Sequence, residues 1–170
     1  RYYREQLSTA EDDYAVYARS SFTSDQRRII IANDVTSKYT RRSTSEYRKI
    51  AGYIEEFTAA RQGNYMVFFP SYAFLNHVLE QMNQPLETRI LIQNPSMTES
   101  EKEEFLNAFD TENTDTLVGF CVMGGIFSEG IDLVSDRLIG AAVVGTGLPQ
   151  VCRERELLKS YFDGRGVNGF

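Results

Sequence analysis

Residues 65–69, YMVFF, form an unbroken apolar run of strand length. A strand that buries one face alternates apolar and polar residues, whereas a run without alternation is typical of a strand buried on both faces, as in a parallel sheet. Four other runs read as strands: RIIIAND at 28–34, RILIQ at 89–93, TLVGFCVM at 116–123 and LIGAAVVG at 138–145. The small residues of the last run indicate close packing beneath a helix.

Helical patterns alternate with these strands. Ser43 and Glu46 have the spacing of a capping box, which marks the start of a helix. Gly63 is the stop signal at the end of that helix. Ser71 and Thr98 begin two further helices, and residues 150–162 form a last one. Strands that alternate with helices predict an α/β fold, in which helices cover both faces of a mainly parallel sheet.

Turns that follow the strands are the candidate functional sites. In parallel sheets the working residues lie outside the carboxyl ends of the strands, where turns and helix N-termini converge. The turns at 70–72, 124–132 and 145–150 all follow predicted strands. We therefore expect all three to lie along one edge of the sheet.

Two of these turns carry polar side chains. Ser71 and Tyr72 stand at a helix N-terminus, a place that can bind anions such as phosphate, although an ordinary N-cap is the simpler interpretation of Ser71. Glu129 and Asp132 flank Gly130, so Asp132 is placed to accept hydrogen bonds from a ribose and Glu129 to hold an arginine or a water. An acidic turn with a glycine hinge is the plain alternative.

Charge is unevenly distributed along the 170 residues, whose net charge is −6. Residues 27–49 contain the cations Arg27, Arg28, Lys38, Arg41, Arg42, Arg48 and Lys49 against two acids, whereas residues 99–136 contain ten acids and the single cation Lys102. One end is therefore suited to phosphates and the other repels them, unless both are simply solvated surfaces.

Several site classes find no support in the sequence. Cys121 and Cys152 make neither a disulfide framework nor a metal site, and we expect no metal ligands. No apolar run reaches the length of a membrane span and RYYREQLSTA lacks a signal core, so we expect a cytoplasmic protein without a membrane partner. Neither phosphate-binding motif, G-x-x-x-x-G-K-[ST] or G-x-G-x-x-G, is present, so another domain would have to supply a phosphate cradle.

Three segments resemble one family of proteins. GNYMVFFPSYAFLNHVLEQM resembles motif IV of the DinG/XPD family of superfamily 2 DNA helicases, and GGIFSEGIDLVSDRLIGAAVVGTGLPQ resembles motif V. RYYREQL is similar to the segment after motif III. The resemblance implies a RecA-like (P-loop NTPase-type) three-layer sandwich without its own Walker A motif. Residues 1–27 would be a lead-in segment, and residues 28–170 the second motor domain, truncated before motif VI.

The resemblance also implies an activity: ATP-driven unwinding of DNA with 5′ to 3′ translocation on a single strand. ATP and Mg would be bound mainly by the first motor domain of the same protein. The expected partners of this chain are that first motor domain and single-stranded DNA. The isolated chain is expected to be inactive and to hold no cofactor. The implied roles are catalysis for Glu129 and Asp132, cofactor binding for Ser128, Gly130, Asp132 and Arg137, and DNA binding for Ser71 and Tyr72.

Departures from the family pattern keep other functions open. Ser135 replaces the usual Gly of the GDRL motif, SSF at 20–22 replaces SPF, and the arginines of motif VI are missing. One alternative is a non-catalytic α/β module that binds phosphate, nucleotide or a protein. Another is a small flavodoxin-like enzyme that uses Glu129 and Asp132. Topology alone does not separate these three functions.

Overall fold

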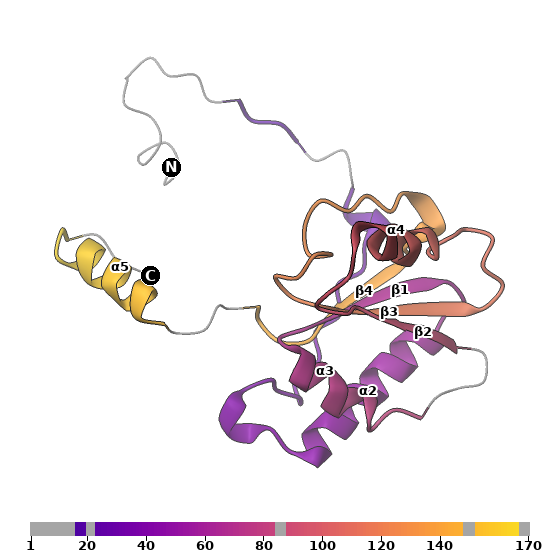
Figure 1. Cartoon of the computed structure of the whole chain (residues 1–170), viewed down its shortest axis with the longest axis horizontal. Coiled ribbons are helices and arrows are strands. Elements are labelled where there is room, and N and C mark those ends of the chain that lie inside the picture. Colours follow the sequence, from indigo (N-terminus) through magenta and orange to yellow (C-terminus); the bar gives the residue numbers. More distant parts are fainter. Residues whose placement is uncertain (1–15, 20–22, 84–87, 148–151, 167–170) are drawn as a thin grey trace. The chain divides into compact units, whose positions relative to one another are not determined.

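The computed structural model describes residues 16–19, 23–83, 88–147 and 152–166. The chain divides into two compact units, residues 1–32 and residues 33–170. The second unit contains the sheet and the four α-helices of the described residues, which Figure 1 shows labelled along the chain.

The described part of the first unit contains one 3-10 helix, η1 (Ser24–Gln26). The strand predicted at 28–34 is wrong: these residues pair with no strand, and the side chains of Ile29, Ile30 and Ile31 are 72%, 73% and 83% exposed. β propensity describes how well a residue fits a packed, paired surface, so an isoleucine run without a partner strand stays irregular.

Four strands of the second unit form one parallel sheet. They are β1 (Asn64–Phe69), β2 (Thr88–Ile92), β3 (Thr116–Val122) and β4 (Gly140–Val143), in the order β2-β3-β1-β4. Strand β1 lies in the interior of the sheet, with Tyr65 opposite Val118 of β3 and Gly140 of β4. Every strand pair is parallel, which confirms the fold class predicted from the unbroken apolar runs.

Helices cover both faces of this sheet. Figure 1 shows α2 (Thr44–Ala59) and α3 (Tyr72–Leu79) on one side and α4 (Glu99–Asn107) on the other. The three layers agree with the predicted RecA-like sandwich. The remaining elements of this unit are α5 (Arg153–Asp163) and the 3-10 helices η2 (Tyr39–Arg41) and η3 (Ser135–Arg137).

The alternating side chains of β1 fill two hydrophobic clusters. Tyr65, Val67 and Phe69 pack with α2 and α3, whereas Met66 packs with Phe105 of α4 and its neighbours. All four β1 side chains are at most 3% exposed. A strand with a cluster on each face has no solvent side, which is the physical reason for its unbroken apolar run.

Side-chain caps begin the helices where the sequence predicted them. The hydroxyl of Ser43 accepts a hydrogen bond from the Glu46 amide at 3.2 Å, but the Glu46 carboxylate accepts from the Thr36 amide at 2.7 Å and does not complete the capping box. Thr98 and Glu101 form the reciprocal box, with distances of 3.3 and 2.7 Å. Hydrogen bonds from Thr98 hold the pKa of Glu101 below its ordinary value.

The small residues of β4 do pack closely beneath a helix, and that helix is α2. A Cβ atom added to Gly140 would lie 2.7 Å from the rings of Phe57 and Tyr65. On the other face of the strand, Val143 is 62% exposed. Helix α5 follows Cys152, and the start predicted at Pro149 and Gln150 falls outside the described residues.

Ser135, which stands where the resembled GDRL motif has glycine, has a backbone conformation that favours glycine. Its φ is +57°, in the left-handed region that costs a residue with a side chain about 1–2 kcal/mol. Because glycine also raises the entropy of the unfolded chain, we expect Ser135→Gly to stabilise the protein by about 0.5–1 kcal/mol net in urea unfolding. Ser96→Gly is the control in an exposed turn without positive φ, and it should be neutral or destabilising. Equal effects of the two substitutions would contradict strain at Ser135.

Candidate functional site

Strands β1, β3 and β4 end at the same height in the sheet. The Met123 amide donates to the Phe69 carbonyl at 2.8 Å, and the Val144 amide donates to the Phe68 carbonyl at 2.8 Å. The turns after β1, β3 and β4 therefore begin at the same edge, as predicted, and we call this edge the carboxyl rim. Residues 148–150 of the third predicted turn lie outside the described residues.

Ser71 follows β1 and begins α3 at this rim. Its hydroxyl accepts a hydrogen bond from the Phe74 amide at 3.2 Å, which is the geometry of an N-cap. The Ser71 side chain is half-buried. This bond establishes the helix-starting role of Ser71, whereas contact with DNA stays a prediction.

Ser71→Ala separates these two roles. Losing the cap should cost about 1 kcal/mol of unfolding free energy, measured by urea denaturation. If the hydroxyl also contacts a phosphate, affinity for single-stranded DNA should fall by a comparable hydrogen-bond energy, about 1 kcal/mol. Ser71→Thr keeps the hydroxyl and should keep most of both. A loss of stability with unchanged DNA affinity would leave Ser71 with the capping role alone.

Tyr72 lies beside a buried glutamine, Gln93, which no sequence motif had indicated. Gln93 is 2% exposed and its side-chain oxygen accepts from the Val122 amide at 2.9 Å, so it links the ends of β2 and β3. Burial raises the pKa of the Tyr72 phenol, while a hydrogen bond with Gln93 opposes that shift. The one sequence signal for Gln93 was its position at the end of a predicted strand.

The predicted acidic turn belongs to the β3–β4 loop, residues 123–139. The Ser128 hydroxyl donates to the Val122 carbonyl at 3.2 Å, which holds Ser128 at the carboxyl rim. Phe127 stacks on Phe105 of α4, with ring centroids 4.4 Å apart, and is 2% exposed. This buried ring holds the start of the loop against the sheet.

The two carboxylates of the predicted acidic turn, Glu129 and Asp132, are exposed. Gly130, between them, is also exposed and has a φ of +74°. Ile131 and Leu133, on either side of Asp132, pack against the cluster around α4. Asp132 is therefore held by its apolar neighbours while its own side chain is accessible.

Arg137 lies at the opposite end of the sheet. Its guanidinium donates to the Phe109 carbonyl at 2.8 Å and to the Leu106 carbonyl at 3.0 Å, at the C-terminus of α4. A cation near the C-terminus of a helix interacts favourably with its last carbonyls and with the helix dipole. The structure brings Ser71, Tyr72 and Ser128 to the carboxyl rim, but it does not bring Arg137 to them.

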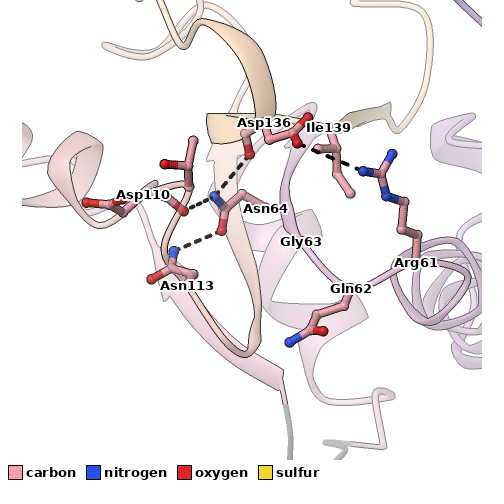
Figure 2. A pocket seen from close by; sticks show the side chains of 9 residues that line it. Arg61, Gln62, Gly63, Asn64, Asp110, Asn113, Asp136 and Ile139 are labelled. Atoms are coloured by element: carbon pink, nitrogen blue, oxygen red, sulfur yellow. Dashed lines mark hydrogen bonds and ion pairs between the residues drawn. The ribbon is translucent and has the colours of Figure 1, made fainter.

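A pocket also lies at this opposite end, before the strands begin. Figure 2 shows the amide of Asn64 at its centre, donating to the Asp110 carbonyl at 2.8 Å and accepting from Asn113 at 2.9 Å. The pocket has a volume of about 140 Å³. The Asn64 side chain is already hydrogen-bonded to residues that follow α4 and to Asp136 of η3. We therefore interpret the polar lining of this pocket as structural, because it joins the start of β1 to these two elements. The residues around it are Arg61, Gln62, Gly63, Asn64, Asp110, Thr111, Asn113, Asp136 and Ile139.

In residues 16–19, 23–83, 88–147 and 152–166, no group of three or more His, Cys, Asp and Glu side chains is arranged to hold a metal ion. Nor does any helix in the same ranges combine the length and the apolar character that crossing a bilayer requires. Burial raises the pKa of Cys121 to about 12, so its thiol stays protonated near neutral pH.

Known proteins are similar to this chain in sequence and in fold. ATP-dependent DNA helicase XPD of Sulfolobus acidocaldarius is 31% identical over 120 residues, covering 70% of this chain and 20% of that protein. ATP-dependent DNA helicase CHL1 of Coccidioides immitis is 36% identical over 115 residues, covering 56% of this chain and 13% of that protein. A solved structure titled XPD_APO superposes with a TM-score of 0.59 at 22% identity, over 75% of this chain and 25% of that one, and supports the fold.

A family model, described as the helicase C-terminal domain, matches residues 54–170. The chain spans about a fifth or less of the length of the relatives it matches. The match covers most of the chain and includes β1, Ser71 and the whole β3–β4 loop. The chain therefore belongs to the DinG/XPD family of superfamily 2 helicases, as a C-terminal helicase domain.

Proposed function

We propose that this chain is the second motor domain of an ATP-dependent DNA helicase and that its carboxyl rim forms half of the nucleotide site. The observation that carries the proposal is that Ser71 and Ser128 lie on the same rim, on turns similar to two helicase motifs. Relatives named as ATP-dependent DNA helicases support the activity. A cytoplasmic location and translocation along single-stranded DNA are parts of the same proposal.

The β3–β4 loop would be the nucleotide side of the rim. Ser128, Glu129, Gly130 and Asp132 would face ATP when a first motor domain closes over them, and the exposure of both carboxylates leaves them accessible to it. A carboxylate near phosphates acts through an arginine, a water or a sugar hydroxyl, because direct contact would repel. Phosphoryl transfer would then be promoted by positioned charges.

ATP and Mg would be held mainly by the first motor domain. The rim contributes hydroxyls and two separated carboxylates, and the chain has no Walker A motif. This donor set suits contact with a ribose or a water better than a phosphate cradle or a metal site. When bound, ATP supplies the phosphoryl transfer that drives movement along DNA, and this chain contributes one wall of the closed cleft.

Single-stranded DNA would run past the N-terminus of α3. Ser71 and Tyr72 lie there. Burial raises the pKa of the Tyr72 phenol, and the protonated phenol can donate a hydrogen bond to a phosphate oxygen. The Ser71 hydroxyl is already used by the Phe74 amide as an acceptor, so toward DNA it would act as a donor.

The test compares this chain alone with a protein that contains both motor domains. The two-domain protein should hydrolyse ATP faster when single-stranded DNA is present and should unwind a duplex with a single-stranded tail. The chain alone should do neither, because its half of the cleft has no phosphate cradle. DNA-stimulated ATP hydrolysis by the chain alone would contradict the proposal that the first motor domain supplies the phosphate cradle. A two-domain protein that binds nucleotide but never hydrolyses it would favour the non-catalytic module.

A further inference from the structure

The segment 38–42, which we call the basic platform, contains cations and an exposed aromatic ring. Lys38, Tyr39 and Arg41 are exposed, and Tyr39 is 81% exposed. Residues 35–45 contain no acid, although the chain as a whole has a net charge of −6. Glu46, the first acid after the platform, is 8% exposed and its carboxylate is bonded to the Thr36 amide. The platform is therefore a local positive surface with no acid of its own.

The platform has a defined shape. Arg42 donates to the Ser37 carbonyl at 3.2 Å, and its guanidinium carbon lies 5.2 Å from the centre of the Tyr39 ring. The Arg41 amide donates to the Lys38 carbonyl at 3.0 Å, which closes the turn of η2. A ring held in place by a guanidinium loses less conformational entropy when a base stacks on it.

The platform adjoins the carboxyl rim. The guanidinium carbon of Arg42 also lies 5.0 Å from the centre of the Phe74 ring, in the first turn of the helix that Ser71 begins. A Cβ atom added to Gly145, just after β4, would lie 2.5 Å from the Ser37 hydroxyl. The contacts of Ser37 and Arg42 thus connect the platform with the turns that follow β1 and β4.

The acidic surface lies on the other layer. Glu99, Glu101, Glu103 and Glu104 belong to α4, which covers the opposite face of the sheet from α2 and α3. Charges on opposite faces of a domain are largely screened from each other at physiological salt, where the Debye length is about 8 Å. A phosphate chain is therefore attracted to the side of the platform and repelled from the side of α4.

We propose that the basic platform binds single-stranded DNA, with a base stacked on Tyr39 and phosphates paired with Lys38 and Arg41. Cations that follow a backbone together with an exposed aromatic ring are the combination by which proteins bind single strands without sequence preference. The choice of DNA rests on the proposed function, whereas the stacking and pairing rest on the platform. The platform would extend the strand's path beyond Ser71 and Tyr72.

Charge reversal tests the phosphate contacts. In titrations of a fluorescent oligothymidylate at low salt, Lys38→Glu with Arg41→Glu should weaken binding about 10-fold or more. The slope of log affinity against log salt should become shallower by about 1.4, or 0.7 for each lost contact. The matched control, Arg61→Glu with Arg89→Glu, makes the same charge change near the opposite ends of the strands and should have a much smaller effect. Equal losses in the two double variants would overturn the proposal.

Substitution of the ring tests stacking. Tyr39→Ala should weaken oligothymidylate binding about 5-fold or more, while binding of inorganic polyphosphate, which has no bases, should be unchanged. Tyr39→Phe should retain the wild-type affinity. An oligouridylate titrated in parallel shows whether the surface prefers DNA, and tighter binding of that RNA would overturn the choice of DNA. Unchanged oligothymidylate affinity in Tyr39→Ala would overturn the stacking claim.

The outcome is separable from that of the proposed function. The substituted side chains of the platform are exposed, so thermal unfolding should match wild type in Tyr39→Ala and in Lys38→Glu with Arg41→Glu. ATP hydrolysis by the two-domain protein without DNA should also be unchanged by Lys38→Glu with Arg41→Glu. If that hydrolysis is absent in the wild type but oligothymidylate still requires the platform, the motor function fails and the platform stands. If neither the chain nor the two-domain protein binds oligothymidylate, the platform proposal fails.

Discussion

Asp132→Ala should lower ATP turnover by the two-domain protein about 100-fold or more, a loss of the size seen when a charge-stabilising group is removed from a reaction centre. The folded state should persist, because the side chain is exposed and the loop is held by Ile131 and Leu133. The change in unfolding free energy should stay within about 0.5 kcal/mol, as for other exposed positions. Steady-state ATP hydrolysis with saturating DNA, together with urea unfolding, measures both expectations.

Asp136→Ala is the matched control for this substitution. Asp136 is an exposed acid in the same loop, but it borders the pocket at the amino ends of the strands, with its carboxylate 4.0 Å from Arg61. Its removal should leave turnover near wild type. Unchanged turnover in Asp132→Ala would remove Asp132 from the site, and equal losses in both variants would indicate a general need for negative charge.

Arg137→Ala should destabilise the domain by about 2–4 kcal/mol, because two charge-assisted hydrogen bonds to the end of α4 are lost. For a domain of this size that corresponds to a fall in melting temperature of roughly 5–15 °C. Calorimetry or thermal unfolding of this chain measures it, and no nucleotide is needed. Arg137→Lys should recover only part of the lost stability. The lysine ammonium keeps the positive charge, but it lacks the planar pair of donors with which the guanidinium reaches both carbonyls.

Arg89→Ala serves as the control for Arg137→Ala. The Arg89 guanidinium also donates to a carbonyl of the same region, Ala108, but at 3.3 Å and in an exposed position, so its loss should cost less than about 1 kcal/mol. The same experiment tests the predicted nucleotide role of Arg137. If Arg137→Ala abolishes ATP turnover in the two-domain protein while unfolding is unchanged, the nucleotide role is correct and the capping role is minor.

Local patterns predicted most of the fold. The apolar run at 65–69 indicated a strand covered on both faces, and the hydroxyls of Ser71 and Thr98 marked helix starts that the structure confirms. These features depend on interactions between groups a few residues apart in the chain, so they can be predicted from short stretches of the sequence. The isoleucine run at 28–34 has the same local character as β1, but β1 has partner strands on both sides and that run has none.

Pairs of residues far apart in the chain were beyond that reasoning. Gln93 reaches the Val122 amide across 29 residues, and Arg137 reaches Phe109 across 28. Both contacts depend on strand order and on where the β3–β4 loop crosses the sheet. The contact of the Arg42 guanidinium with the Phe74 ring is of the same kind.

The alternation of strands and helices along residues 43–145, the parallel direction of the strands and the edge that carries Ser71 and Ser128 follow from residue patterns alone. Hydrophobic periodicity and capping are short-range, and the right-handed, parallel connection leaves few alternatives. Packing decided which polar groups remain accessible: it left Asp132 exposed, bonded Arg137 to the end of α4 and set the basic platform beside the rim. These outcomes depend on how the loops cross the sheet, because a side chain's partners are set by the elements folded against it.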